Sequence, residues 1–294
     1  MNWDFIYRDE TRALDETARA AAGGSFVDLP DGCTHYELGG PADGRPVGLV
    51  HGFSVPGFIW DGTFETLCSA GRRVLRYDLF GRGYTDRPHT RYDLDLFIRQ
   101  LADLLDALHL PDVDLVGLSM GGVVAAGFTV KYPARVRRLA LIDPIGTQPM
   151  PLNALYRAAL LPGISELALG LIGTERMVAG LASDFFDPTE VEHFRARYRE
   201  QMAFRGFKRA IISTLRNKVV DGSPDTYRRL GQLQTPVLLL WGRHDATLPF
   251  AQSRSIIELV PRARFQIVEG AGHIPNVEQP EATHALLLAF LNSE

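Results

Sequence analysis

Ser119 lies in the sequence GLSMGG, which covers residues 117–122 and directly follows the strand-like apolar run Val113 to Val116. The small and apolar residues that follow it are typical of the start of a helix. A serine between a strand and a helix, with glycines two positions away on either side, is typical of a nucleophile elbow. Only residues without bulk fit beside the serine in so sharp a turn, which holds the hydroxyl clear of the sheet. We therefore predict that Ser119 is a nucleophile that attacks a carbonyl carbon.

A serine is a poor nucleophile at neutral pH, and two later segments offer groups that would activate it. His273 ends the sequence GAGH, which follows the strand-like run Phe265 to Val268. Asp245 ends the sequence GRHD, which follows the apolar run Val237 to Trp241. A neutral imidazole takes the serine proton, and a carboxylate on its other ring nitrogen fixes the tautomer and stabilises the imidazolium. We predict His273 as the base and Asp245 as the acid.

A further motif, His51-Gly52-Phe53, ends an earlier apolar strand, so the motifs follow the chain order turn, serine, aspartate, histidine. In this order they resemble the α/β-hydrolase superfamily, and the resemblance extends from about residue 25 to the C-terminus. It implies that the backbone N–H groups of Phe53 and Met120 stabilise the developing oxyanion. It implies no cofactor, and the histidines and acids do not cluster at the spacing of metal ligands.

Two other aspartates also follow predicted strands. Asp143 follows the run Val136 to Ile142, and the superfamily can place its acid after an earlier strand. Asp143 is therefore a rival to Asp245, and its alternative role is that of a structural acid at the entry to the next segment. Asp78 lies in the sequence YDLFGRG, whose glycines favour a loop shaped by side-chain-to-backbone hydrogen bonds. We expect Asp78 to be structural.

Short apolar runs alternate with helix-spaced segments, which predicts an α/β fold with a doubly wound, mostly parallel sheet. The turn Pro30-Asp31-Gly32 predicts an antiparallel hairpin of strands 25–29 and 33–38 at one edge of this sheet. The other strands are predicted at 47–50, 73–77, 113–116, 136–142, 237–241 and 264–268, and the helices at 58–70, 94–110, 120–132, 250–260 and 280–291.

The alternation stops after Asp143-Pro144, and only helix-spaced segments appear before Pro236. We therefore predict a helical cap, residues 146–230, inserted between two parts of the core, residues 25–145 and 231–294. Residues 1–24 are predicted to form an N-terminal helical extension, with a helix from Trp3 to Ala22. The cap helices are expected at 152–161, 164–171, 175–185 and 188–204.

Aromatic residues near the predicted turn and in the predicted cap are candidates for an apolar substrate pocket. We expect Trp60, Phe185 and Phe186 to line it; their alternative role is helix packing. The late cap is rich in basic residues, which is typical of a solvated helix face. A sharper hypothesis is that Arg205 meets a carboxylate of the substrate.

The residues beside the motifs narrow the chemistry that the resemblance implies. Epoxide hydrolases and haloalkane dehalogenases carry an aspartate where this chain has Ser119. Meta-cleavage-product hydrolases, which split carbon–carbon bonds, usually carry asparagine before the serine and tryptophan after the histidine, where this chain has Leu118 and Ile274. The departure favours a hydrolase of small to medium carboxylic esters, similar to monoacylglycerol lipases and small carboxylesterases. A carbon–carbon bond hydrolase and a small-molecule receptor on the same fold remain the alternatives.

Composition excludes several other classes. With 294 residues, 46% of them hydrophobic, the chain is long enough to bury a sizeable core. A formal net charge of −4 gives no general attraction to nucleic acid. No apolar run approaches the roughly 20 residues that span a bilayer, so we expect no stable membrane insertion. Cys33 and Cys68 form no paired motif, which favours reduced thiols in a cytoplasm. The oligomeric state stays open.

Overall fold

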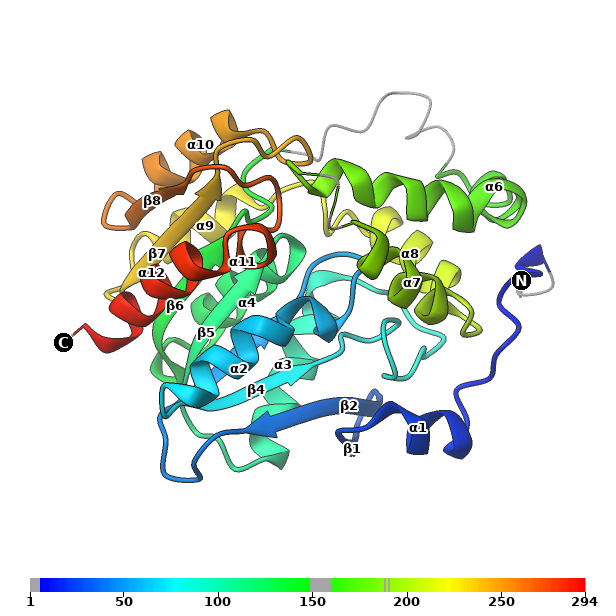
Figure 1. The fold of residues 1–294 in the computed structure, drawn as a ribbon, viewed down its shortest axis with the longest axis horizontal. Helices are drawn as coiled ribbons and strands as arrows, with labels where there is room; N and C mark the ends of the chain where they lie inside the picture. The colour runs from blue at the N-terminus through cyan, green and yellow to red at the C-terminus, as the bar shows by residue number, and fades with distance from the viewer. Residues whose placement is uncertain (1–5, 149–159, 188, 190, 294) are drawn as a thin grey trace.

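The computed structural model describes residues 6–148, 160–187, 189 and 191–293 (Figure 1). An eight-stranded sheet lies at its centre, in the strand order β1-β2-β4-β3-β5-β6-β7-β8. The strands are β1 (Ser25–Leu29), β2 (Gly32–Gly39), β3 (Pro46–Val50), β4 (Arg73–Tyr77), β5 (Val113–Leu118), β6 (Val136–Ile142), β7 (Val237–Gly242) and β8 (Arg264–Val268).

The first two strands form an antiparallel hairpin, and β2 also pairs antiparallel with β4. All pairs from β4 to β8 are parallel. Every residue of β5 and of β7 is buried, as expected for parallel strands covered on both faces. The predicted α/β fold, with a mostly parallel sheet and an antiparallel hairpin at one edge, is confirmed.

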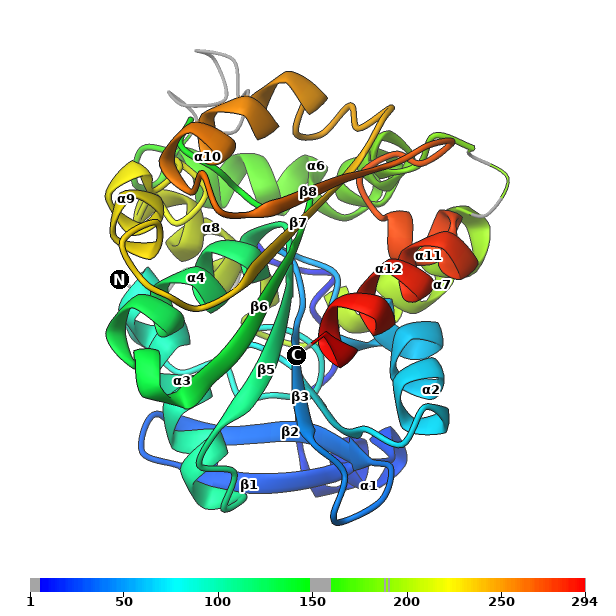
Figure 2. The same ribbon diagram turned by 90° about the vertical axis from the view of Figure 1, so that its left-hand side faces the viewer.

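Helices cover both faces of the sheet, and α3 and α4 lie on the face opposite to α2 and α12 (Figure 2). Successive residues of a strand point to opposite faces of the sheet. Leu115 of β5 therefore packs in the hydrophobic cluster that includes residues of α3 and α4, and the next residue, Val116, packs in the cluster that includes residues of α12. The core helices are α2 (Asp61–Ser69), α3 (Leu94–Ala107), α4 (Met120–Lys131), α9 (Pro224–Leu230), α10 (Ser253–Leu259), α11 (Pro275–Glu278) and α12 (Pro280–Asn292), with short 3₁₀ turns η2 (Gly57–Trp60), η3 (Pro133–Arg135) and η6 (Phe250–Gln252).

Four elements between β6 and β7 lie together to the right of the sheet in Figure 1, and we call them the cap helices. They are α6 (Ile164–Gly180), η4 (Leu181–Asp184), α7 (Val191–Met202) and α8 (Phe207–Arg216). The two helices predicted at 164–171 and 175–185 are one continuous helix that tightens into η4. The helix predicted at 152–161 lies largely outside the described residues. The last helix of the predicted cap segment, α9, packs against α4 and α10 of the core.

The N-terminal segment is helical only in α1 (Glu16–Ala22), so the predicted helix from Trp3 was too long within the described residues. The Asp15 side chain accepts a hydrogen bond from the Ala18 N–H at 2.9 Å and caps α1 at its start. Before Asp15 the chain does not continue the helix but runs along the cap helices. The N–H of Arg12 donates to Ala203 O, and the N–H of Arg205 donates to Arg12 O, both at 2.9 Å. These tertiary bonds replace those of a helix.

Among the described helices, none is both long and apolar enough to cross a bilayer.

Candidate active site

Ser119 stands between β5 and α4 with φ 54° and ψ −119°, a conformation that is strained for a residue other than glycine. Three backbone hydrogen bonds hold it there, each 3.0 Å long: the Ser119 N–H donates to Ile142 O, and Ser119 O accepts from the N–H groups of Gly122 and Ile145. The strain therefore persists because β6 and the first turn of α4 fix the backbone on both sides.

The glycines around Ser119 are needed because the elements approach so closely. A Cβ atom on Gly121 would lie 2.1 Å from Val50 O, and one on Gly117 would lie 2.4 Å from Gly121 O. A Cβ on Gly122 would lie 2.5 Å from the Cβ of Pro144. The contacts explain why GLSMGG folds as a tight turn: β3, β5 and α4 leave no room for side chains beside the serine.

The structure brings the predicted base and acid together. The Nδ1–H of His273 donates to Asp245 Oδ2 at 2.8 Å, and both residues are buried. The other carboxylate oxygen of Asp245 accepts from the N–H groups of Thr247 at 2.9 Å and Leu248 at 2.8 Å. Burial lowers the pKa of His273, but Asp245, together with Asp184 and Glu278, outweighs this effect, and the net pKa is raised.

The rival acid, Asp143, is completely buried beside this pair. Its Oδ1 accepts from the Gly242 N–H at 2.9 Å. One oxygen of Asp143, one of Asp245 and one ring nitrogen of His273 all lie within 4.8 Å of one another. Burial, reinforced by the neighbouring Asp245, raises the pKa of Asp143 well above its usual value. His273 donates its Nδ1–H to Asp245 and not to Asp143.

Asp78 shapes its loop through the side-chain-to-backbone hydrogen bonds that the sequence predicts. Its Oδ1 accepts from the Gly57 N–H at 2.8 Å, and its Oδ2 accepts from the Tyr84 N–H at 2.9 Å. The Nδ1–H of His35 donates to the same carboxylate at 2.8 Å. A Cβ on Gly83 would overlap the carboxylate at 1.9 Å, which accounts for a glycine there. The predicted side-chain-to-backbone hydrogen bonds of Asp78 are confirmed.

Ser119 and His273 line one cavity of about 210 Å³ between the core and the cap helices. Its surface is mainly apolar, no lysine or arginine is among the described residues that line it, and Asp184 supplies their one carboxyl group. Burial raises the pKa of Asp184. The other lining residues are Gly52, Phe53, Ser54, Val55, Ile59, Leu118, Met177, Gly180, Leu181, Phe185, Phe194, Tyr198, Thr247 and Ile274.

Both residues expected to supply oxyanion donors are near Ser119. Met120 is the first residue of α4, where the N–H groups of the first turn have no acceptor within the helix. Phe53 lies in the loop after β3 and lines the cavity. From these positions the N–H groups of Met120 and Phe53 would be suited to donate to the oxyanion that forms when Ser119 attacks a carbonyl carbon. Their role as oxyanion donors stays a prediction.

Comparison with known proteins identifies the family. A model described as "Alpha/beta hydrolase family" matches residues 49–286. The chain belongs to this family. The 2-hydroxy-6-oxo-2,4-heptadienoate hydrolase of Pseudomonas putida is 32% identical over 266 residues, which cover 85% of this chain and 90% of the relative. These matches support a hydrolase activity.

Solved structures give the same result for this α/β hydrolase. A meta-cleavage product hydrolase of Pseudomonas fluorescens is 26% identical, with a TM-score of 0.75, over 92% of this chain and 97% of that protein. A thermophilic esterase of Thermogutta terrifontis is 25% identical, with a TM-score of 0.77, over 91% and 98% of the two chains. The neighbours therefore include both meta-cleavage product hydrolases and esterases.

Of the four predicted pocket residues in this α/β hydrolase, Phe185 lines the cavity and three do not. Trp60 is completely buried in the hydrophobic core against α12 and the sheet. Phe186 is 51% exposed and stacks on His244 at a centroid distance of 4.0 Å. Arg205 is exposed, and its backbone is held by Arg12 on the outside of the cap helices. The pocket assignment is thus corrected for Trp60, Phe186 and Arg205.

Sequence reasoning missed Arg82, a completely buried arginine next to the site. Its Nε donates to Phe53 O at 2.8 Å, one Nη donates to Phe80 O at 3.0 Å, and the other donates to Thr214 Oγ1 of α8 at 3.0 Å. Burial lowers the pKa of Arg82 to about 10. The arginine thereby ties the loop of Phe53 to the cap helices. Its position in the sequence GRG, after a strand, was the available signal.

Proposed function

We propose that this protein hydrolyses a small to medium carboxylic ester through an acyl-enzyme on Ser119. The observation that carries the proposal is the shared apolar cavity: a strained serine and a buried histidine held by a carboxylate line the same space. A serine and an oriented imidazole at one cavity are the parts that acyl transfer needs.

The proposed reaction has two halves. Ser119 Oγ attacks the ester carbon while the Nε2 of His273 takes its proton, and Asp245 stabilises the imidazolium. The oxyanion is held by the N–H groups of Met120 and Phe53; losing one such donor typically raises the barrier by about 2.7–4 kcal/mol. The imidazolium returns the proton to the departing alcohol. Water, deprotonated by His273, then attacks the acyl-enzyme, releases the acid and restores the serine.

The lining of the cavity supports an uncharged substrate. Leu118 and Ile274 flank the serine and the histidine with apolar surface, and no cation lines the described part of the cavity. A carboxylate brought into such a space would lose its hydration without gaining a charged partner, which costs several kcal/mol. A neutral ester carries no such penalty.

Hydrolysis of a carbon–carbon bond is the second candidate, and the relatives favour it. The Pseudomonas putida relative is named for a heptadienoate, which is a carboxylate, and the Pseudomonas fluorescens structure is a meta-cleavage product hydrolase. A carboxylate substrate of that kind would meet no lysine or arginine in the described lining of this cavity, which is why we propose the ester first.

The test is hydrolysis of p-nitrophenyl esters of increasing acyl length beside a 2-hydroxy-6-oxo-dienoate, with wild type and Ser119→Ala. We expect ester turnover with a maximum at a short or medium acyl chain, and a loss of at least about 10⁴-fold in the variant. Turnover of the dienoate alone would overturn the proposal in favour of the second candidate. Binding of either compound without turnover would instead indicate a receptor.

A further inference from the structure

Two acidic residues reach the same end of the sheet from neighbouring strands. Asp143 directly follows β6, Asp245 follows β7 within a few residues, and the two strands pair in parallel. Asp143 is anchored to β7 on both sides: its N–H donates to Leu240 O at 3.0 Å, and its Oδ1 accepts from the Gly242 N–H at 2.9 Å. Asp143 also has a positive φ of 40°, which is strained for an aspartate. The fold therefore holds this carboxyl group in one place.

The hydrogen bonds distribute charge unequally between the two acids. Asp245 accepts two backbone N–H groups on one oxygen and the His273 Nδ1–H on the other. Asp143 accepts one N–H, and no donor reaches its buried Oδ2 in the described part of the chain. Two buried carboxylates with oxygens within 4.8 Å of each other repel, which favours a proton on one of them. The one with three donors keeps the charge, so Asp143 carries the proton.

The remaining titratable groups around Asp143 act in the same direction. Glu278 of α11 lies near enough to disfavour a charge on Asp143, and Asp184 of η4 faces His273 from the cap helices. Both are acids, so each opposes a further negative charge. The same three atoms of Asp143, Asp245 and His273 are close enough for a metal ion, but the hydrogen bonds above already use Asp245 and Nδ1 of His273.

We propose that Asp143 is a positioning residue that donates its proton to the Asp245 carboxylate and replaces Asp245 as the acceptor for His273 when Asp245 loses its charge. The inference rests on the proposed role of His273 as the base. In Asp245→Asn the nearest carboxylate that opposes a charge on Asp143 is gone, and the imidazole of His273 is left without its acceptor. Asp143 then releases its proton to solvent, and His273, one of whose ring nitrogens lies within 4.8 Å of an Asp143 oxygen, turns its Nδ1–H to it.

A double-mutant cycle with Asp143→Asn and Asp245→Asn tests the proposal. In wild type, Asp143→Asn is expected to lower kcat by about threefold, because the amide still donates to Asp245 but more weakly than a carboxylic acid. Asp245→Asn should lose about 10²-fold, and the double variant about 10⁴-fold, the loss typical of a triad whose acid becomes an amide. The proposal would be overturned if Asp143→Asn lowered kcat by the same factor in wild type and in Asp245→Asn. It would also be overturned if either single variant were already as slow as the double variant.

Asp114→Asn is the matched control. Asp114 is also completely buried, but it lies near the start of β5 beside Arg137 and Arg72, at the opposite end of the strand from Ser119. Its effect should be the same in both Asp245 backgrounds. Thermal unfolding of every variant shows whether a loss of activity reflects unfolding.

The proton NMR spectrum separates this inference from the proposed function. The downfield Nδ1–H resonance of His273 should persist in Asp245→Asn and disappear in the double variant, whether or not any ester is turned over. Loss of the resonance in Asp245→Asn alone would contradict the role of Asp143. Wild type that fails to hydrolyse every ester, with the resonance behaving as expected, would contradict only the proposed function.

Discussion

The molecule contains two buried histidine–aspartate pairs with nearly the same local geometry. In each, the Nδ1–H of the histidine, His273 or His35, lies 2.8 Å from Oδ2 of its aspartate, Asp245 or Asp78. Each aspartate also accepts two backbone N–H groups. Burial lowers the pKa of both histidines, and the partner aspartate together with other nearby acceptors and acids raises it by more in total. The hydrogen bond within the pair therefore does not decide its function.

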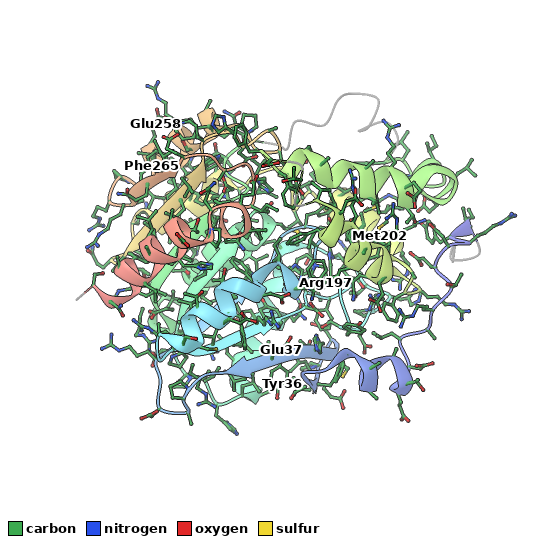
Figure 3. All side chains as sticks on the ribbon, viewed as in Figure 1. Tyr36, Glu37, Arg197, Met202, Glu258 and Phe265 are labelled. Atoms are coloured by element: carbon green, nitrogen blue, oxygen red, sulfur yellow. The ribbon has the colours of Figure 1, made fainter. Side chains whose placement is uncertain are left out.

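The second ring nitrogen and the surrounding cavity separate the two pairs. The Nε2 of His35 lies 3.1 Å from Gly23 O, so both of its nitrogens face acceptors and the ring is suited to be a cation. His35 lines a cavity of about 220 Å³ whose charged side chains include Glu37 of β2 and Arg197 of α7 (Figure 3). His273 shares an apolar cavity with Ser119. The histidine of such a pair is a candidate base only where its Nε2 faces a cavity in which a reacting group can bind.

Exchanging the two histidines for alanine should separate activity from stability. His273→Ala removes the proposed base and should lower kcat at least about 10⁴-fold. His35→Ala leaves the buried Asp78 without its ion-pair partner and should lower the free energy of unfolding by about 3 kcal/mol, with kcat changed less than about threefold. Ester hydrolysis and urea unfolding of both variants measure this. A large loss of kcat in folded His35→Ala would show that the two pairs are not functionally distinct.

The pH dependence sharpens the same comparison, because activity and stability should respond with opposite signs. Only neutral His273 accepts the serine proton, and its pKa is raised, so kcat/KM falls about a hundredfold over two pH units below that pKa. The pKa of His35 is also raised above the value near 6.5 of the unfolded chain, so its contribution to stability is complete below that value and is lost as pH rises through the folded pKa.

Rate and unfolding profiles from pH 5 to 9 test these slopes, and His35→Ala is the control. In that variant kcat/KM should still rise with pH, and the free energy of unfolding should fall less with rising pH than in wild type. Asp78, whose pKa is lowered to about 2 by its histidine partner against the effect of burial, stays charged throughout. An activity profile that moves with His35→Ala would contradict the assignment of the rise to His273.

The sequence predicted the strands well, and it placed Ser119, Asp245 and His273 after strands, because both depend on local patterns. The strands at 73–77, 136–142 and 264–268 agree with the structure to the residue, since each is a short run rich in apolar residues between segments with turn or helix patterns. Ser119, Asp245 and His273 each follow such a run. Parallel strands end at the same edge of a sheet, so residues far apart in the chain meet there.

The features that the sequence did not predict depend on contacts between distant segments. The first part of the N-terminal segment pairs with residues 203–205 instead of continuing a helix, and no local pattern encodes that partner. Arg205 belongs to the same contact, which keeps its side chain outside the cap helices. Whether Asp143 or Asp245 holds His273 depended on loop geometry after two neighbouring strands, which residue types do not specify.

Phe185 and Phe186 give the smallest test, on neighbouring residues that the sequence could not distinguish. The backbone of Phe185 is extended, with φ −105° and ψ 138°, and in extended chains successive side chains point to opposite sides. Phe185 therefore lines the cavity, while Phe186 stacks on His244 outside it. Phe185→Leu should enlarge the cavity, favour a longer acyl chain and change kcat/KM between neighbouring chain lengths by about tenfold. Phe186→Leu should leave the preference unchanged; equal shifts in both variants would show that the two side chains do not divide between cavity and surface.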